Sequence, residues 1–388
     1  MVTPADWQEV RLGEVLDYEQ PTKYLVSSRD YVEGGMVPVL TAGKSFLLGY
    51  TDDLVGIYSD LPTIIFDDFT TATQWVDFDF KVKSSACKML KPKRGACDLR
   101  YVYERLRALN YRTSDHKRHW ISVFHTMEMR MPPLMEQEAI AETLSDADAA
   151  IESLDALIAK KRDVKQAAMQ QLLTGRTRLP GFTANWKEVR LGDLGTCIRG
   201  VSYKGDSDLS NWDTPTTVRL LRSNNVQNSL IQFNDVQYVN HECVSDAQIL
   251  RRDDIVICMA NGSKALVGKS GLFKGSSGFD YTFGAFMGCF RSSLDRANPL
   301  FVRYLLLTKQ YQDFISNILA GSSINNLTPK SIESLCFKMP KVKEQEAIAE
   351  ALSVMDDELE TLTEQVLKLR MVKEGMMQDL LTGKVRLV

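Results

Sequence analysis

The sequence has no segment suited to entering or crossing a membrane. No apolar stretch approaches the eighteen or so residues of a spanning helix, and no early segment joins a basic start to an apolar run. We therefore expect a cytoplasmic protein. The seven cysteines lie far apart without a Cys-x-x-Cys pair, which indicates reduced thiols rather than a disulfide framework or a zinc site.

Signatures of catalysis and cofactor binding are missing as well. Gly43–Ser45 and Gly268–Ser270 each lack the upstream glycine of a phosphate-binding loop. His116 and His119 have no cysteine or carboxylate set around them at the spacing of metal ligands. Asn298–Phe301 lacks the second proline of the motif found in amino-methyltransferases. We expect no active site, no metal site and no cofactor bound by this chain.

Neither sign of charge prevails over the whole chain. The 47 Lys and Arg nearly balance the 50 Asp and Glu, for a net charge of −3, so any binding of nucleic acid must depend on local patches. The 388 residues allow two or three domains, and 44% hydrophobic with 25% charged residues is an ordinary composition.

Internal repetition is the feature that the sequence does have. Glu136–Glu142 returns unchanged as Glu344–Glu350, and the register holds without a gap as far as Leu179 and Leu387, always 208 positions apart. About half of the aligned residues are identical, which indicates duplication.

A second repeated segment has a different spacing. Trp7–Gly13 returns as Trp186–Gly192, 179 positions later, so the second copy must contain 29 extra residues before its long repeat. We call the stretches between opening and long repeat the first body, Glu14–Pro133, and the second body, Asp193–Pro340. The bodies share little that can be aligned.

Each long repeat predicts an amphipathic helix. The helix would begin after Pro133 or Pro340 and end at Gly175 or Gly383, so that about forty residues form a rod of roughly 60 Å. Apolar side chains recur in alternating steps of four and three, which predicts a seam that packs lengthwise against another helix. The predicted seam residues are Ile140, Leu144, Ile151, Leu154 and Ile158 in the first copy, and Ile348, Leu352, Leu359, Leu362 and Val366 in the second.

Charge predicts how the two helices pair. The first half of each repeat is acidic and the second half is basic, as in Glu136–Asp155 followed by Lys160–Lys165. Antiparallel alignment sets acid beside base, so we expect an antiparallel pair. Ordinary amphipathic helices in unrelated domains are the alternative.

Both bodies alternate buried-looking strands with polar turns, which is typical of α/β domains. We expect an α+β protein with a pseudo-two-fold repeat, in which two α/β domains are joined by two long antiparallel helices. The expected boundaries are 1–133 and 180–340 for the domains, and 134–179 and 341–388 for the helices.

The first body contains a basic run. Between Lys81 and Arg130, thirteen Lys and Arg face four acids, with aromatic residues interleaved. This favours a phosphate-binding face, although a solvated face would have the same composition. The candidate phosphate contacts are Lys81, Lys83, Arg112, Lys117 and Arg118. Lys44 and His119 are further candidate DNA contacts of this body.

The second body has strands that lead into loops of short polar side chains. Such side chains pair with base edges, as Asn does with adenine and Arg with guanine, but plain turns have the same composition. The candidate base contacts are Arg222, Ser223, Asn224, Asn225, Asn261, Ser263, Lys264, Asn325 and Asn326.

This arrangement resembles the DNA-specificity subunit of type I restriction-modification enzymes across nearly the whole chain. Lys341 departs from the pattern, because the first copy has Pro133 there. The segments that look like those of the family are Met131–Leu144 and Met339–Leu352 at the helix openings, Leu172–Gly175 and Leu380–Gly383 at the helix ends, and Trp7 and Trp186 at the repeat openings.

The resemblance implies that each body is a target recognition domain for one half of a split DNA site, and that the helices separate the two. It implies two partner subunits that methylate adenine with S-adenosylmethionine, and restriction subunits that use ATP and Mg²⁺. This chain would bind double-stranded DNA without catalysing a reaction.

Two other functions are compatible with the sequence. A stand-alone DNA-binding regulator would use the same bodies without enzyme partners. A coiled-coil scaffold would show no salt-dependent affinity for DNA.

Overall fold

The computed structural model describes residues 4, 6–27, 31–43, 45–109, 111, 118–276, 278–321 and 325–387. The chain divides into two compact units. Unit 1 comprises Met1–Leu157 and Leu362–Val388, and unit 2 comprises Ile158–Thr361. Each unit therefore holds one body together with a piece of each long helix.

Unit 1 contains a four-stranded sheet in the order β2-β8-β5-β6 and a three-stranded sheet in the order β4-β3-β7. β5 lies inside the larger sheet, and its first four residues are buried, as expected of a run of Thr, Ile and Phe. The elements of this body are β1 (Gln8–Arg11), α1 (Leu12–Val15), β2 (Leu16–Glu19), η1 (Pro21–Tyr24), β3 (Val37–Leu40), β4 (Leu47–Thr51), β5 (Thr63–Asp67), β6 (Thr73–Val76), β7 (Lys81–Val82), β8 (Cys87–Pro92), α2 (Leu99–Ala108), α3 (His119–Ser122), η2 (Phe124–Thr126) and β9 (Glu128–Met131).

Unit 2 contains a six-stranded sheet in the order β11-β20-β17-β18-β15-β14 and a four-stranded sheet in the order β12-β16-β13-β19. Its strands are β10 (Lys187–Arg190), β11 (Gly195–Arg199), β12 (Leu209–Ser210), β13 (Thr217–Leu221), β14 (Val226–Gln227), β15 (Leu230–Ile231), β16 (Gln237–Asn240), β17 (Asp254–Cys258), β18 (Ser270–Phe273), β19 (Tyr281–Phe283), β20 (Met287–Ser292) and β21 (Cys336–Met339). Its helices are α5 (Leu191–Leu194), α6 (Gly205–Asp208), η3 (Ser223–Asn225), η4 (His241–Cys243), η5 (Asp246–Gln248), η6 (Lys264–Leu266), α7 (Pro299–Leu305), α8 (Lys309–Ala320) and α9 (Pro329–Glu333).

The two bodies share one strand topology although their sequences do not align. The order β2-β8-β5-β6 in unit 1 corresponds to β11-β20-β17-β18 in unit 2, and β4-β3-β7 corresponds to β16-β13-β19. In both bodies the last pair, β3–β7 or β13–β19, is parallel. The bodies differ mainly in their loops: six residues join β3 to β4 but fifteen join β13 to β16, and five join β5 to β6 but eleven join β17 to β18.

The repeated opening segment forms a strand that closes each body. β1 pairs antiparallel with β9, with Gln8 opposite Met131, and β10 pairs in the same register with β21, with Lys187 opposite Met339. The start and end of each body therefore lie side by side, and extra length between them does not disturb the pair. This arrangement explains why the opening repeats at 179 positions and the helix at 208.

The long repeats form helices α4 (Leu134–Leu172) and α10 (Val342–Leu380), each of 39 residues. Their bounds differ by the 208 positions of the repeat at both ends. The turn after each helix places Gly175 at φ +70° and Gly383 at φ +73°, and an added Cβ would meet the ring of Trp186 or Trp7. The repeated tryptophans therefore pack against the glycines that end the helices.

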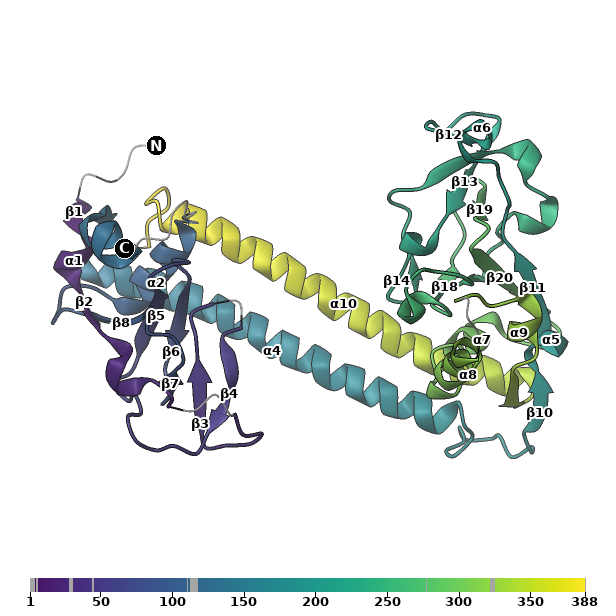
Figure 1. Cartoon of the computed structure of the whole chain (residues 1–388), viewed down its shortest axis with the longest axis horizontal. Coiled ribbons are helices and arrows are strands. Elements are labelled where there is room, and N and C mark those ends of the chain that lie inside the picture. Colours follow the sequence, from purple (N-terminus) through teal and green to yellow (C-terminus); the bar gives the residue numbers. More distant parts are fainter. Residues whose placement is uncertain are drawn as a thin grey trace. The chain divides into compact units, whose positions relative to one another are not determined.

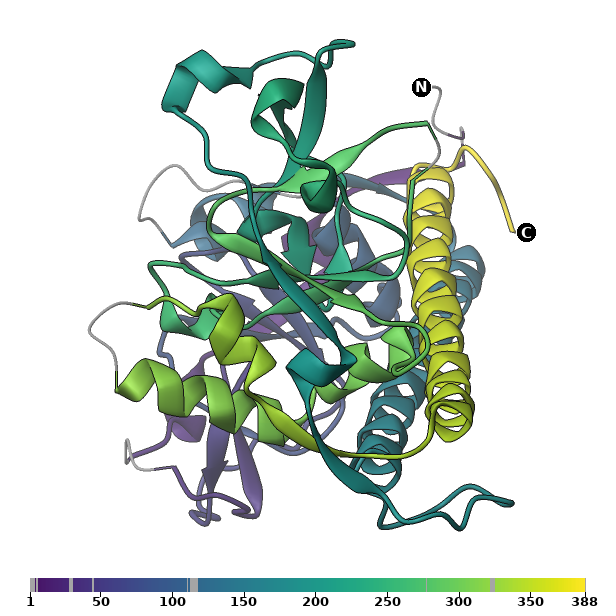
Figure 2. The ribbon, with the colours of Figure 1, turned by 90° about the vertical axis from the view of Figure 1, so that its right-hand side faces the viewer.

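Within each unit the pieces of α4 and α10 lie side by side and run in opposite directions (Figures 1 and 2). In unit 1, Arg370 of α10 donates to Asp155 of α4 at 2.8 Å. In unit 2, Lys161 of α4 lies 2.6 Å from Glu358 of α10. The basic half of each helix thus faces the acidic half of the other, which confirms the predicted antiparallel pairing.

The predicted seam is buried or half-buried along its whole length, but it has two kinds of partner. Ile140 and Leu144 lie in a core with α2 of the first body and the end of α10, and Ile348 and Leu352 lie in a core with α7 and the end of α4. The middle of the seam, such as Ile151, is only half-buried. The seam therefore fastens each body to the helices as well as one helix to the other.

No helix in the described ranges has the length and apolarity needed to cross a membrane. All seven cysteines are unpaired, and five of them are buried. Burial raises the pKa of Cys97 and of Cys197 to about 12, so these thiols stay protonated at neutral pH.

Candidate nucleic-acid interface

Unit 2 contains an open cavity of about 1050 Å³ at the ends of several of its strands. Segments after β13, before β16, after β17, between β19 and β20, and before α9 contribute to it. These include the two loops that are longer than their counterparts in unit 1. The polar residues that line it include Arg222, Ser223, Asn224, Asp235, Asn261 and Asn325.

Five of the predicted base contacts therefore meet in one place, although they come from three separate segments of the chain. The side-chain amide of Asn261 donates to Ser223 Oγ at 3.2 Å and accepts from the backbone N–H of Ser263 at 3.0 Å. Asn325 Nδ2 donates to the carbonyl oxygen of Gly262 at 3.2 Å. These bonds connect the three segments and hold their side chains in place.

The loop after β13 depends on Asn225, which sequence reasoning placed among the base contacts. Its side chain is 1% exposed, accepts from the backbone N–H of Arg222 at 2.9 Å, and donates to the carbonyl oxygens of Gln232 and Asn234 at 3.1 and 2.8 Å. An amide fully engaged in this way supports the loop from beneath. We therefore remove Asn225 from the candidate DNA contacts.

Three other predicted residues of the second body lie outside the lining of the cavity. Ser263 and Lys264 lie at the start of η6, and Lys264 lines a separate pocket beside α8. Asn326 forms a β-bridge with Ala260, which anchors the segment that carries Asn325.

The cavity also contains residues that the sequence analysis missed. Asp235 itself has a φ of +53°, and Phe286 is 70% exposed in the short connection from β19 to β20. Tyr203 and Gln237 complete this set. No sequence pattern marks them, because only the parallel pairing of β13 and β19 brings these segments to one edge.

The basic run of the first body is largely neutralised inside unit 1. Lys81 is 1% exposed, and its ammonium lies 2.8 Å from Asp53 and also donates to the carbonyl oxygen of Val55. Lys88 is fully buried and lies 2.9 Å from Asp68. Aspartates of the same body thus pair with these cations, which corrects the prediction that Lys81 contacts phosphate.

His119 is also corrected. It is 2% exposed, and its Nδ1 lies 2.9 Å from the carbonyl oxygen of Asp68. The Asp68 carboxylate accepts from the backbone N–H of Trp120 at 3.0 Å, so this segment is tied to the sheet. A histidine enclosed in this way has no surface to offer to DNA.

Of the remaining candidates in unit 1, Arg118 is exposed and Lys83 is half-buried, with its ammonium 5.9 Å from the centre of the Tyr31 ring. Lys44, Arg112 and Lys117 lie outside the described residues.

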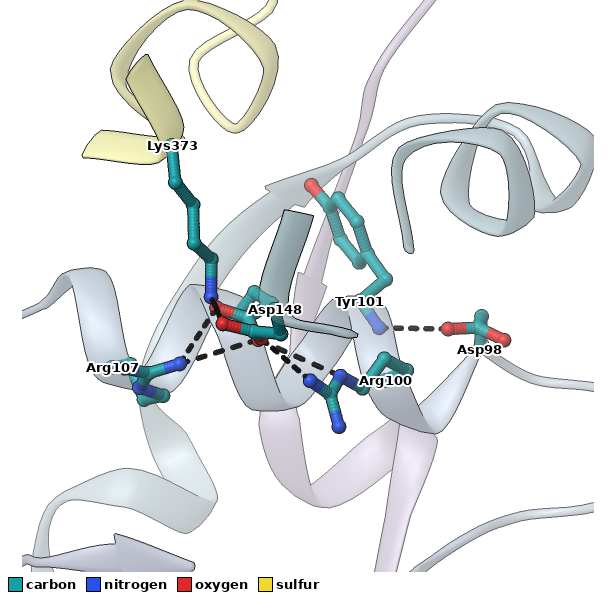
Figure 3. Close-up of polar contacts among 7 residues, drawn as sticks. Asp98, Arg100, Tyr101, Arg107, Asp148 and Lys373 are labelled. Atoms are coloured by element: carbon teal, nitrogen blue, oxygen red, sulfur yellow. Dashed lines mark hydrogen bonds and ion pairs between the residues drawn. The ribbon is translucent and has the colours of Figure 1, made fainter. Parts of the chain in front are cut away.

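Other basic residues of this run join the body to the long helices. Glu104 of α2 is completely buried and lies close to Arg100, Arg107 and Lys373. Asp148 of α4 pairs with Arg100 and Lys373, and Figure 3 shows both cations reaching the Asp148 carboxylate. The cluster engages these cations where α2 meets the helices, although the Arg107 side chain is still 42% exposed.

Unit 2 repeats the central pair of this cluster. Lys165 and Asp356, the residues 208 positions from Lys373 and Asp148, form the same ion pair, and Arg303 and Tyr304 of α7 bond to the same carboxylate at 3.1 and 2.7 Å. Burial acts to raise the pKa of Asp356, but hydrogen bonds from Lys165 and Tyr304 hold it below its ordinary value. Within the described residues, no group of three or more His, Cys, Asp or Glu is arranged to hold a metal ion.

Comparison with known proteins gives a consistent match over both halves. Residues 4–160 and 183–369 each match the type I restriction modification DNA specificity domain. The chain is 31% identical over 370 residues to the specificity subunit of the Escherichia coli type I restriction enzyme EcoR124I/EcoR124II, covering 91% of this chain and 87% of the relative. It is 22% identical over 410 residues to the MjaVIII specificity subunit of Methanocaldococcus jannaschii, covering 99% and 94% of the two chains.

Solved structures share the fold at lower identity. The S subunit of a type I restriction-modification system from M. genitalium matches with a TM-score of 0.66 and 16% identity, over 96% of both chains. A chain from a study of the assembly and conformational transition of the type I R-M system matches with a TM-score of 0.54 and 15% identity, over 99% of this chain and all of the other.

Proposed function

The chain belongs to the type I restriction-modification DNA specificity family, and on this premise we propose that its two bodies recognise the two halves of a split, asymmetric DNA site. The chain is the specificity subunit, which recognises the DNA target and has no catalytic role of its own. S-adenosylmethionine and ATP are used by the modification and restriction subunits of the complex.

The observation that carries the two-half proposal is the cavity of unit 2. It gathers side chains with donors and acceptors from separate loops, and this mixture suits base edges in the major groove. The bodies share strand topology but differ in the loops after equivalent strands. If the loops contact the bases, two bodies with the same strand topology but different loops should recognise different half-sites.

We assign the parts of the chain accordingly. Residues 1–133 form the first target recognition domain and residues 180–340 the second, and the segments 134–179 and 341–388 form the two long helices. In unit 1, Arg118 and Lys83 remain proposed phosphate contacts, together with Arg112 and Lys117, and Lys44 remains a proposed DNA contact.

The proposed partners are two DNA adenine methyltransferase subunits and the ATP- and Mg²⁺-dependent restriction subunits. Assembly into a type I complex with DNA follows from the family. Because the proposed ligand is the DNA of the host, we place the chain in the cytoplasm.

The test is a domain exchange read out by DNA methylation. Glu14–Pro133, which includes β9, is replaced by the first body of another family member, while β1 and the whole second body are retained, and the methylated sequence of the host genome is mapped. One half of the site should change while the other half and the gap stay the same. A change in both halves, or in neither, would show that the bodies do not act separately.

Purification of the complex and measurement of its DNA binding distinguish the proposed function from the two alternatives, a stand-alone regulator and a coiled-coil scaffold. A stand-alone regulator would purify without methyltransferase subunits and leave no methylated motif. A scaffold would bind no nucleic acid, so it would show no salt-dependent affinity for DNA.

A further inference from the structure

We propose that Asp235 determines one position of the half-site read by unit 2, by accepting a hydrogen bond from the exocyclic amino group of a cytosine or an adenine. The inference rests on the proposed function, because it assigns a base contact within the same cavity.

The Asp235 carboxylate is fixed in position by two neighbours in the cavity. Its Oδ2 accepts from Asn224 Nδ2 at 2.8 Å and from Arg222 Nη2 at 3.1 Å. Arg222 Nη2 also donates to the Asp235 carbonyl oxygen at 3.0 Å, which fixes the backbone of the same residue. Two hydrogen bonds to the side chain and one to the backbone keep the carboxylate oriented before any ligand arrives, and this lowers the entropic cost of binding.

The other carboxylate oxygen is left for a ligand. The Asp235 side chain is 75% exposed, and among the described residues no donor reaches Oδ1. An ionised carboxylate only accepts hydrogen bonds, so it needs a donor from outside the protein.

DNA offers few donors of this kind. Phosphates and sugar ring oxygens carry no N–H group, and the phosphate charge repels a carboxylate. In the major groove the donors are the N4 amino group of cytosine and the N6 amino group of adenine. The adjoining Arg222 offsets the carboxylate charge, so Asp235 can approach the duplex without repelling it strongly.

The test uses the assembled complex and base analogues. Each cytosine of the unit 2 half-site is replaced in turn by pyrimidin-2-one, and each adenine by purine, so that only the exocyclic amino group is lost. One replacement should weaken binding by wild-type protein about tenfold to hundredfold, the range for a hydrogen bond to a charged group. Binding by Asp235→Ala should not weaken further at that position, which identifies the base and its partner.

A second variant changes the preference rather than removing it. In Asp235→Asn the side-chain oxygen still accepts from Arg222 and Asn224, and the new amide group donates toward the base. This variant should prefer thymine where the wild type selects cytosine, or guanine where it selects adenine, because these bases present a keto oxygen there. Unchanged base preference in Asp235→Asn would overturn the proposal.

Asp213→Ala is the matched control. Asp213 pairs with Arg219 at 2.7 Å in the same unit but lines a different depression. In this variant, each base-analogue replacement should weaken DNA binding by the same factor as in the wild type. If every analogue replacement also weakens binding by Asp235→Ala as much as it weakens binding by the wild type, the carboxylate only supports its loop and the proposal is wrong. Failure of the proposed function has another signature, since the wild-type complex would then not distinguish its site from unrelated DNA.

Discussion

Arg386 and Glu136 form an ion pair across 250 residues of sequence, with Nη2 2.7 Å from Oε2. Glu136 lies in the first turn of α4, and Arg386 follows the end of α10. The repeat contains an equivalent pair in unit 2. Arg178 corresponds to Arg386 and Glu344 to Glu136, each 208 positions apart, and Arg178 Nη2 also lies 2.7 Å from Glu344 Oε2. The glutamate in the first turn of each long helix therefore binds the arginine that follows the end of the other long helix.

Loss of this pair should destabilise unit 1. Glu136 is completely buried, so Arg386→Ala leaves its carboxylate without the cation that compensates its desolvation. Hydrogen bonds from Arg386 to Asp6 and Glu136 also raise the pKa of Arg386, which shows that its charged form is favoured. Thermal unfolding should occur at a lower temperature than in wild type. The control Lys384→Ala removes only an exposed pair with Asp379 and should change the midpoint little.

The ion pair of Asp356 should make stability depend on pH. The folded-state pKa of this group lies below the ordinary 3.8, so its contribution is present above that pH and is lost as pH falls through the lowered pKa. Asp356→Asn should therefore lower the free energy of unfolding at pH 7 by about 1–3 kcal/mol, and by less at pH 3. Urea unfolding at both pH values measures this, with the exposed Asp357→Asn as control. An equal loss at both pH values would contradict it.

Truncating the seam where it meets a body should cost more than truncating the outer face of the same helix. Leu352 is completely buried among residues of α4 and the second body, so Leu352→Ala should lower the free energy of unfolding by about 2–5 kcal/mol. Val354 is 63% exposed two residues later, and Val354→Ala should stay within about 0.5 kcal/mol. Equal losses would mean that the seam does not pack as described.

Arg118 should contribute to DNA affinity without contributing to sequence preference. A phosphate contact releases counterions, so Arg118→Ala should reduce the slope of log affinity against log salt by about 0.9. The methylated motif should stay the same. A shifted motif with an unchanged slope would show instead that Arg118 contacts a base.

The helices were predictable because duplication and periodicity are local signals. Their predicted starts after Pro133 and Pro340 agree with the structure to within one residue, and each helix ends three residues before the predicted glycine, Gly175 or Gly383. The opposed charges, such as Lys161 and Glu358, also gave the direction of pairing.

The candidate site was only partly predictable, because its geometry depends on tertiary packing. The polar loops of the second body correctly indicated that Arg222, Asn224 and Asn261 lie at the candidate site. Asn225 belongs to the same polar loop, but its side chain is buried. A run of cations such as Lys81 and Lys88 gives no sign that aspartates elsewhere neutralise it. The common topology of the bodies was hidden for a related reason, since many different apolar side chains fill one strand position.

The closing strands β1–β9 and β10–β21 have an evolutionary consequence. Each body enters and leaves the conserved part of the chain at one antiparallel strand pair, so the gene segment between those strands can be exchanged as a unit. Gln137 and Gln345 complete the junction by accepting from the backbone N–H groups of Asp98 and Asn298, at 2.9 Å in both cases. A junction made to backbone atoms places little restriction on the side chains at positions 98 and 298. Recombination at these strands would replace a body in one step, but the incoming body must still supply side chains that contact α4 and α10, as Arg100 and Glu104 of α2 do here.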